Sequence, residues 1–545
     1  MSKYLNIKDQ AAMMIAILLV AFFASCTKDF PKKNATWNGS ASATFAQIYQ
    51  SIGAQLDLTA QGEDNAGTRW LYPITQQGAV YAASDFGYGQ GANWSGFYQN
   101  LAAANQLFTM AASSPDSATY TNAIAMVKVL RAYQAIELSN FYGDIPYSKA
   151  GKGISGSTAN LTVPYDKQQA VYLSCLNDLT WAVNHFNTSA NQFSLGSSEF
   201  LLTNNIPQWI KFANSLRLRY ALTMYDKDNA DAGPIIADAL NKPLLTDPVA
   251  DVVGLNSTNI PGLGFDYNGA GRGFAFRQES RIRMGSTMWN LLSNNNNPDG
   301  SGIFDPRAKI YFEVNGNGAW VPYPQNPTSP ISDGGDPYNP ERDNDWNKDK
   351  SGNLFSDFNY YWGRDGIAPG STGTIPEIFM TPAEVHFLKA EVYARGIAGI
   401  AQNMTAAKTE YEAGITSSIT FWTTMAFTDP IWVVNKPASA TPSATDIANV
   451  LTNPKVAFNP ANALQQIYAQ EWIDLFRQPW VAWTLMRRTG GATPADTNNP
   501  GGYTQNYGSL QRYQYPGDEQ LYNNVNWKAE TGGSDLTSTK IWIAK

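Results

Sequence analysis

The stretch from Asn459 to Gly490 constrains the fold most, because it concentrates large apolar side chains at helical spacing. Asn459 followed by Pro460 is typical of a helix start, since the amide can cap free N–H groups and proline has no N–H to leave unpaired. The apolar residues that recur at three- and four-residue steps, and so share one face, are Leu464, Ile467, Tyr468, Trp472 and Leu475. Pro479 should end or redirect this helix, and a second apolar helix follows. We expect a pair of core helices here rather than a ligand site.

Composition narrows the class of protein. A chain of 545 residues usually forms two or more domains, although one large helical assembly is possible. Charged residues make up 15% and aromatic residues 13%, which favours a folded protein with well-furnished loops over a disordered one. A pI of about 5.1 argues against nucleic acid as a partner. The only histidines, His185 and His386, leave little room for zinc or histidine-based catalysis, and we interpret both as ordinary helix residues.

The N-terminus carries a localisation signal. Lys3 and Lys8 precede an apolar run over residues 11–24, and Ala24-Ser25-Cys26 then resembles a bacterial lipobox, although Phe23 stands where leucine is usual. We therefore expect residues 1–25 to be a lipoprotein signal peptide, Cys26 to carry the lipid, and residues 26–40 to form a lipidated tether to the outer membrane, exposed at the cell surface. An uncleaved membrane anchor is the alternative. Only Cys175 then remains, so no disulfide framework is expected.

Periodicity along the rest of the chain predicts one domain over residues 41–545. Amphipathic helices are expected over 41–58, 94–112, 117–141, 166–186, 206–225, 286–292, 381–396 and 403–420. Capping boxes are predicted at Asp166 with Gln169 and at Thr381 with Glu384. The helices make a stack from 41–243 and 377–490, interrupted by a loop-rich insertion over 244–376 and followed by a C-terminal loop region over 491–545. Pairs such as 94–112 with 117–141 suggest tetratricopeptide-like stacking.

Several segments, taken in order, resemble one family. Leu130-Arg131-Ala132-Tyr133 leads into Phe141-Tyr142-Gly143-Asp144-Ile145-Pro146-Tyr147, similar to its helix followed by a YGDxPY signature. The helix from Trp209 to Arg219 resembles another of its motifs, with Lys211, Arg217 and Arg219 expected at the surface or in ion pairs. The remaining matches are Asp305-Pro306-Arg307, Ala383–Glu391, Tyr411–Ile415, Gln470-Glu471-Trp472, Trp483–Gly490 and Tyr515-Pro516. The chain is thus similar to the SusD/RagB-like outer-membrane lipoproteins.

This resemblance implies a mainly α fold with about four tetratricopeptide-like helix pairs and a large irregular, loop-rich part. It also implies a partner, a SusC-like TonB-dependent barrel transporter that the lipoprotein covers as a lid. Members capture glycans, or in some cases peptides, and are not catalytic. Their ligand-binding residues vary from member to member, so none is carried over to this chain.

Aromatic side chains on loops are the candidate ligand contacts. Sugar rings stack their C–H faces on Trp and Tyr, while neighbouring amides and carboxylates bond the hydroxyls, and such a site needs aromatics on loops rather than on helix faces. The candidates are Trp70, Tyr72, Tyr81, Tyr88, Trp320, Tyr323, Trp346, Tyr361 and Trp362. We expect at least two of them to form a ligand platform. The alternative for each is that it packs its loop onto the helical stack.

A metal site and an enzymatic activity are weaker hypotheses. Oxygen ligands alternate at Asp343, Asp345, Asn347 and Asp349, which suits a structural calcium ion, but this segment lacks the glycine and glutamate of an EF-hand loop and fits a solvated acidic loop as well. No other cofactor is expected. The sequence has no G-x-S-x-G, H-E-x-x-H or Walker A motif, although a facing pair of carboxylates in a glycoside hydrolase would leave no such trace. A surface scaffold or adhesion protein is a further alternative.

Overall fold

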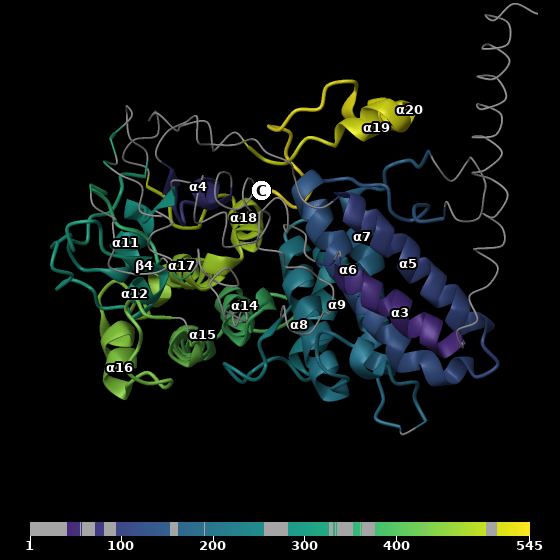
Figure 1. Ribbon diagram of the computed structural model, residues 1–545, viewed down its shortest axis with the longest axis horizontal. Helices are drawn as coiled ribbons and strands as arrows, with labels where there is room; N and C mark the ends of the chain where they lie inside the picture. The colour runs from purple at the N-terminus through teal and green to yellow at the C-terminus, as the bar shows by residue number, and fades with distance from the viewer. Residues whose placement is uncertain are drawn as a thin grey trace, which may run out of the picture. The chain divides into compact units, whose positions relative to one another are not determined.

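The computed structural model (Figure 1) describes residues 41–54, 56, 71–80, 94–152, 162–189, 191–255, 282–325, 331–332, 334, 352–359, 361, 376–430, 432–496 and 510–545. The chain divides into two compact units, Met1–Gln47 and Ile48–Lys545. The first contributes the start of α3 to the described residues, and everything below concerns the second. The lipidation residue Cys26 lies outside the described residues.

Helices dominate the described chain, which confirms the predicted fold class. The longer α-helices are α3 (Ala41–Ala54), α5 (Trp94–Ser113), α6 (Thr121–Tyr142), α7 (Gln168–His185), α8 (Ile206–Met224), α9 (Asn229–Leu240), α14 (Pro382–Arg395), α15 (Met404–Thr428), α16 (Ala444–Thr452), α17 (Ala463–Asp474), α18 (Pro479–Arg488) and α20 (Asn524–Thr531). The shorter ones are α4 (Tyr72–Thr75), α11 (Ser286–Leu292), α12 (Arg307–Tyr311) and α19 (Gly517–Tyr522). Short 3₁₀ turns include η10 (Pro460–Asn462) and η11 (Leu475–Arg477).

The predicted helix pairs are present. α5 packs on α6, α7 on α8 and α14 on α15 (Figure 1). The stack continues because α6 also packs on α7, α8 on α9 and α14 on α17, while α8 contacts α14 and so joins the two helical stretches. Each helix thereby buries an apolar face that it could not cover alone.

The Trp-rich helices form core, as predicted. Trp472 and Trp483 are fully buried and Trp480 is 4% exposed. Asn459 caps the 3₁₀ turn that precedes α17, and Pro479 is the first residue of α18. Cys175 is also buried, inside α7, and carries no disulfide.

The sequence does not predict six of the described helices, which are α4, α9, α12, α16, α19 and α20. α9 and α16 begin at side-chain caps, from Asp228 to the Asp231 N–H and from Ser443 to the Asp446 N–H. α19 and α20 lie in the stretch predicted as a C-terminal loop region, and Trp527 is the only residue of the two helices that is buried. These helices are short and bury few apolar residues, so periodicity gives little signal for them.

One predicted capping box is wrong and one is half right. α7 begins at Gln168 and is not capped by Asp166, because the Asp166 carboxylate instead accepts the backbone N–H groups of Tyr147 and Ser148. Thr381 does cap α14 by accepting the Glu384 N–H at 3.1 Å. The Glu384 carboxylate, however, binds the Arg219 side chain on α8.

Two small antiparallel sheets lie in or beside the loop-rich stretch. The larger has strand order β1 (Ala79–Val80), β3 (Ile282–Arg283), β5 (Asp357–Phe358), β4 (Phe312–Glu313). The smaller pairs β2 (Val253–Leu255) with β6 (Glu377–Met380), and its register shifts at Gly254. A Cβ at Gly254 would lie 2.4 Å from the Glu377 carbonyl oxygen, so glycine permits this close pairing.

Buried ion pairs connect the helices. Arg219 binds Glu384 through two guanidinium nitrogens and donates to the Phe379 carbonyl oxygen, which fastens α8 to α14. Arg217 and Lys211 pair with Asp238 and Asp251. The three cations of this motif were expected at the surface or in ion pairs, and the structure places all three in ion pairs. None of the helices in the described part is both long and apolar enough to span a bilayer.

Candidate ligand-binding site

The predicted loop aromatics that the structure describes are buried. Tyr72 is 2% exposed, Trp320 5%, Tyr323 0% and Tyr361 1%. A sugar ring cannot stack on a face that protein atoms already cover, so these four are withdrawn as ligand contacts. The other candidates, Trp70, Tyr81, Tyr88, Trp346 and Trp362, lie outside the described residues and stay predictions, as do the calcium candidates Asp343, Asp345, Asn347 and Asp349.

The four buried rings pack their loops onto the rest of the molecule, which is the alternative considered above. Trp320 stacks on Trp289 of α11 with ring centroids 5.5 Å apart. Tyr361 lies 4.1 Å from the Trp432 ring, and its hydroxyl donates to the Asp429 carboxylate at 2.5 Å. In the loop-rich part, aromatic rings thus provide the buried packing that helix faces provide in the helical part.

Tyr72 and Tyr323 are buried in the same way. The Tyr72 ring meets Phe358 edge-on at 5.2 Å, and Tyr323 meets Phe355 at 4.7 Å. The Tyr323 backbone is also fixed, because its N–H donates to the Met284 carbonyl oxygen and its own carbonyl accepts the Ser286 N–H. The Tyr72 ring therefore packs on β5 of the larger sheet, and the Tyr323 ring packs on the residues just before β5.

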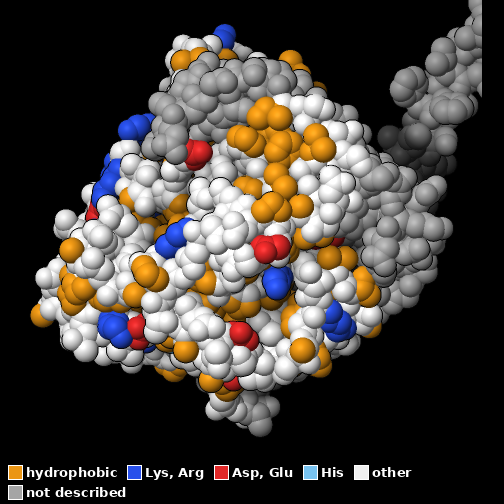
Figure 2. Space-filling view, turned by 90° about the vertical axis from the view of Figure 1, so that its left-hand side faces the viewer, with side chains coloured by type: hydrophobic (Ala, Val, Ile, Leu, Met, Phe, Trp, Pro, Cys, Tyr) orange, Lys and Arg blue, Asp and Glu red, His pale blue; other side chains and the backbone are white. Residues whose placement is uncertain are grey.

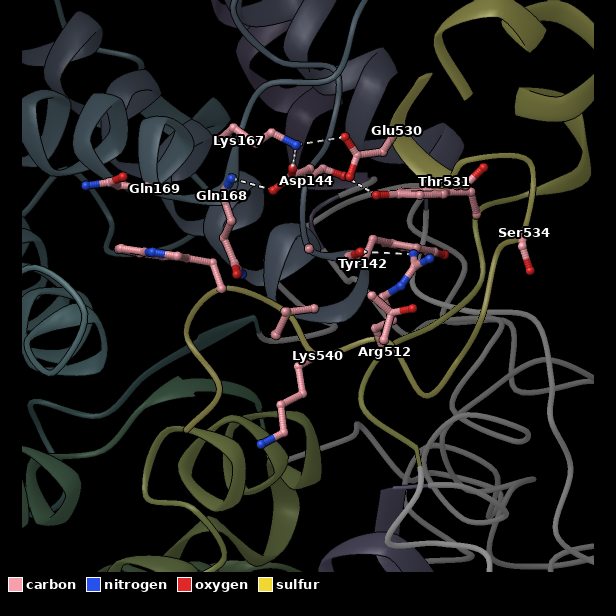
Figure 3. A pocket seen from close by; sticks show the side chains of 15 residues that line it. Tyr142, Asp144, Lys167, Gln168, Gln169, Arg512, Glu530, Thr531, Ser534 and Lys540 are labelled. Atoms are coloured by element: carbon pink, nitrogen blue, oxygen red, sulfur yellow. Dashed lines mark hydrogen bonds and ion pairs between the residues drawn. The ribbon is translucent and has the colours of Figure 1, made fainter. Parts of the chain in front are cut away.

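A pocket of about 460 Å³ lies where the YGDxPY segment meets the end of the chain (Figure 3). We name it the motif pocket. Its lining comes from the turn after α6, the start of α7, α20 and the last residues of the chain: Tyr142, Gly143, Asp144, Lys167, Gln168, Gln169, Arg512, Tyr515, Glu530, Thr531, Ser534, Thr539, Lys540, Ile541 and Trp542. Its volume is in the range of about 300–1,000 Å³ typical of small-ligand sites.

The local sequence explains the position of Asp144. α6 ends at Gly143, whose φ of +87° is a conformation that other residues rarely adopt. The chain then turns so that the Asp144 carboxylate accepts the Gln168 N–H at 2.8 Å, at the first residue of α7. A carboxylate is favourable there because the N–H groups and dipole of the helix point at it. Asp144 thus joins the end of α6 to the start of α7.

One ammonium group joins two carboxyl groups in the motif pocket. The Lys167 Nζ lies 2.6 Å from Asp144 and 3.1 Å from Glu530 on α20, as Figure 3 shows. The hydrogen bond to Asp144, followed by that to Glu530, raises the pKa of Lys167. Burial and the neighbouring Asp144 raise the pKa of Glu530. The two carboxyl groups are therefore engaged in holding α20 to the helical stack.

The floor of the motif pocket is aromatic and its polar groups are occupied. The Tyr515 hydroxyl donates to the Asp144 carbonyl oxygen at 2.7 Å, and its ring stacks on Tyr142 at 5.9 Å. The Arg512 guanidinium forms an ion pair with Asp535 and donates to the Tyr142 carbonyl oxygen. These contacts make the floor rigid and leave ligand recognition to the rim.

The rim provides a ring and hydroxyl groups. Trp542 is half-buried, with its ring edge-on to Tyr172 at 6.1 Å. Ser534, Thr539 and Lys540 also line the pocket and are exposed. A pocket with a partly accessible indole and exposed hydroxyls is suited to a ligand that has both apolar C–H faces and hydroxyl groups.

Sequence reasoning does not find this pocket. Asp144 and Tyr142 stand out only as part of a family motif, and Trp542 stands in a stretch interpreted as loop. A usable signal is present, because a lone tryptophan between Ile541 and Ile543 near the chain end indicates a segment that returns to the core. What brings it against α7 is tertiary packing, which no local pattern encodes.

Comparison with known proteins places this geometry in a family. The sequence model of a SusD-like family, described as "Starch-binding associating with outer membrane", matches residues 33–516. A comparison with curated proteins gives no match. Among solved structures, the chain is similar to a chitin-binding protein, with 21% identity and a TM-score of 0.66 over 92% of this chain and 100% of the other.

Two further structures have the same fold. A chitin-binding SusD homologue from Flavobacterium johnsoniae is 19% identical with a TM-score of 0.64, over 92% of this chain and 98% of the other. A SusD-like protein from Bacteroides thetaiotaomicron is 20% identical with a TM-score of 0.58, again over 92% and 98%. The family match spans most of the chain and the shared fold nearly all of it. The chain therefore belongs to the SusD-like family of starch-binding proteins that associate with the outer membrane.

Proposed function

We propose that this protein is a cell-surface lipoprotein that captures glycans and delivers them to a SusC-like TonB-dependent transporter in the outer membrane. Membership of a starch-binding family supports the ligand class, and two structures with this fold are of proteins named as chitin-binding. The lipobox-like segment ending in Cys26 supports lipid anchoring. Peptide capture through the same kind of transporter is the alternative.

The half-buried Trp542 on the rim of the motif pocket is the observation that carries the proposed ligand class. Its indole has an apolar face for the C–H side of a sugar, and Ser534 and Thr539 add hydroxyl groups to the lining of the same pocket. Hydroxyl groups both donate and accept hydrogen bonds, as sugar hydroxyls do. The loop aromatics outside the described residues remain candidates for the same role.

The charges on the one face of the described residues that Figure 2 draws fit a neutral ligand. Figure 2 shows Lys, Arg, Asp and Glu side chains as separated points on one face of the molecule, without a continuous patch of either sign. Binding of a strongly charged polymer would need such a patch, because its affinity comes from summed charge contacts. A neutral oligosaccharide needs none.

The arrangement of carboxyl groups favours capture over hydrolysis. A glycoside hydrolase places two carboxyl groups on opposite sides of the scissile bond. In the motif pocket, Asp144 and Glu530 instead share the Lys167 ammonium. We expect no new reducing ends when the purified protein is incubated with oligosaccharides, and their appearance would favour the hydrolase alternative.

The ligand class can be tested by calorimetric titration of residues 27–545 with malto- and chito-oligosaccharides and with a peptide digest. We expect heat with one glycan class and an at least ten-fold weaker affinity for Trp542→Ala, after equal melting temperatures have been verified. Tyr522→Ala is the matched control, because Tyr522 is 74% exposed and lies outside the pocket lining. Heat with peptides alone would establish the peptide alternative, and unchanged affinity in Trp542→Ala would remove the motif pocket from the proposal.

The anchor and the partner can be tested separately. Cys26→Ser should release the protein from the membrane fraction, because it removes the acceptor of the lipid. A TonB-dependent barrel should copurify with the wild-type protein from native membranes in mild detergent. A wild-type protein that brings down no barrel would support the scaffold or adhesion alternative.

A further inference from the structure

A second, larger cavity of about 920 Å³ lies between α12, the end of α15 and α16. We name it the α16 groove, and the lining residues that matter here are Asn294, Phe304, Lys309, Asn435, Ser439 and Asn449. It shares no lining residue with the motif pocket. Its elements occupy the left-hand side of Figure 1, the side that Figure 2 faces.

One wall of the groove is a loop held by hydrogen bonds to its neighbours. The Asn435 side chain donates to the carbonyl oxygens of Lys309 at 3.2 Å and Phe312 at 3.3 Å. Asn435 has a φ of +54°, a conformation that asparagine tolerates better than most residues. Thr424 on α15 donates to the Ala440 carbonyl oxygen at 2.8 Å. The loop is therefore positioned before any ligand arrives.

The opposite wall is α16 and the turn that follows it. Ser443 caps α16 by accepting the Asp446 N–H, and after the helix Asn453 donates to the Asn294 side-chain oxygen at 3.1 Å. Lys455 donates to the carbonyl oxygens of Asn290 and Ser293. A groove with both walls fixed avoids the entropy cost of ordering a site on binding.

The lining is rich in uncharged hydrogen-bonding groups. Amide and hydroxyl side chains and apolar side chains contribute to the lining about equally, and the only charged lining residues are Lys309, Lys436 and Asp446. Lys436 is already engaged with the Asp429 carbonyl oxygen, and Asp446 with the Ser443 hydroxyl. The Asn449 amide is exposed and bonds no described residue, and the Phe304 ring is half-buried. The lining groups left for a ligand thus include the Asn449 amide, the Lys309 ammonium and the Phe304 ring.

We propose that the α16 groove is a second glycan-binding site, which takes a neutral, hydroxyl-rich oligosaccharide. Amides match sugar hydroxyls because both kinds of group donate and accept hydrogen bonds, and Phe304 offers an apolar surface to the C–H face of a sugar. This inference rests on the proposed function and extends it. A glycan long enough to reach both pockets would bind more tightly than it binds at either pocket alone.

The groove is poorly suited to the alternative ligands. Peptides held in extended form pair with a free strand edge, whereas these walls are helices and a loop that contains Pro437 and Pro442, which have no N–H to donate. An anionic polymer would find a single free cation, Lys309, among the lining residues. Neutral sugars remain the best match.

The test is hydrogen–deuterium exchange of residues 27–545 with and without malto- and chito-oligosaccharides, combined with calorimetry of variants. We expect slower exchange over residues 435–454 when a bound glycan is present. Asn449→Ala should weaken glycan affinity at least five-fold in a Trp542→Ala background, where the motif pocket is disabled. Thr445→Ala is the matched control, because Thr445 is an exposed residue of the same helix outside the groove lining.

The outcomes separate this inference from the proposed function. Glycan binding with unchanged exchange over 435–454, and unchanged affinity in Asn449→Ala, would overturn the second site and leave glycan capture standing. Protection of 435–454 by the peptide digest alone would assign the groove to peptides and overturn the inference. Absence of binding to any glycan would overturn the proposed function and the second site together.

Discussion

The helical part and the loop-rich part both bury large side chains, but by different means. Between the helices, buried arginines meet carboxylates of distant helices, as Arg219 meets Glu384 and Arg488 meets Glu391 at 2.8 Å. Around the larger sheet, the Phe476 ring contacts those of Tyr311 at 4.1 Å and Phe358 at 5.0 Å. Buried ion pairs occur in both regions, because Arg283 pairs with Asp357 in the larger sheet. The cluster around that sheet depends in addition on rings that must fill space.

This difference predicts two ways in which a substitution can destabilise the fold. Removing one member of a buried ion pair leaves a charge that neither water nor a partner stabilises. Removing a buried ring leaves a cavity and takes away apolar contacts. The loss of stability caused by removing a paired arginine and that caused by removing a packed ring should therefore respond differently to a compensating second substitution and to pH.

The largest effect is expected for Arg219→Met. This change keeps most of the side-chain volume but leaves the carboxylates of Glu384 and Glu137 buried without their cation, with side chains 0% and 2% exposed. We expect the free energy of unfolding to fall by about 3–5 kcal/mol, measured by chemical denaturation. The double variant Arg219→Met with Glu384→Leu should recover part of the loss, and no recovery would show that packing rather than charge is responsible.

Arg487→Met is the matched control within the helical part. Arg487 is as buried as Arg219, and burial lowers its pKa to about 9. Its guanidinium donates to the Gln511 and Trp483 carbonyl oxygens and lies over the Trp483 ring, with no carboxylate among the described residues paired to it. We expect a smaller loss, about 1–3 kcal/mol, because only polar neutral groups lose a partner. Equal losses at the two arginines would contradict the role given to the paired carboxylates.

Phe476→Ala is the corresponding test of the ring cluster around the larger sheet, to which η11 contributes Phe476. Phe476 is fully buried and contacts four aromatic rings, so we expect a loss of about 3–4 kcal/mol through the cavity that remains. Phe476→Leu should cost less because it restores part of the volume. The loss should not vary with pH, in contrast to the helical part, and Phe427→Ala at a 36% exposed position is the control.

Glu471 should make the helical part sensitive to pH. Burial raises the pKa of Glu471 to about 8, against the effect of Arg488. The folded state then retains a proton that the unfolded chain releases near pH 4.3, so stability falls as pH rises from about 4.3 to about 8. Glu471→Gln should reduce this pH-dependent loss in the free energy of unfolding by a few kcal/mol. The measurement is the denaturation midpoint at a series of pH values between 5 and 8.

The pH dependence of Asp474→Asn can be compared with that of Glu471→Gln. Burial raises the pKa of Asp474 to about 6, so Asp474→Asn should flatten the profile only below that pH. A Glu471→Gln profile parallel to that of the wild type would show that Glu471 stays ionised in the folded protein.

The helical part is largely predictable from the sequence, because its helices are long and their apolar residues recur with a clear period. The core positions of Trp472 and Trp483, and the ion pairs of Lys211, Arg217 and Arg219, agree with the patterns in the sequence. α9 and α16 were missed since their starts depend on single caps. The partner of Arg219 could not be predicted, because Glu384 lies on a helix 165 residues away in the chain.

The candidate site is less predictable, for a physical reason. An aromatic residue on a loop can bind a ligand or fix the loop, and sequence does not distinguish the two. Tyr72, at the start of α4, and Trp320 are buried in packing, whereas Trp542, in a segment without helical period, lines a pocket and is half-buried. Long-range packing decides which surface of a ring stays accessible.

The smallest effect is expected for Lys211→Met, which breaks a partly exposed ion pair of the helical part. Burial alone would raise the pKa of Asp251, but the Lys211 ammonium and the N–H groups of Thr246 and Asp247 hold it below its usual range. Those two N–H groups remain after the substitution, at 2.9 and 3.0 Å from the carboxylate. We expect a loss of about 1 kcal/mol or less by chemical denaturation. A loss comparable to that of Arg219→Met would mean that ion pairs stabilise this part regardless of burial, and the contrast between paired charges and packed rings would have to be redrawn.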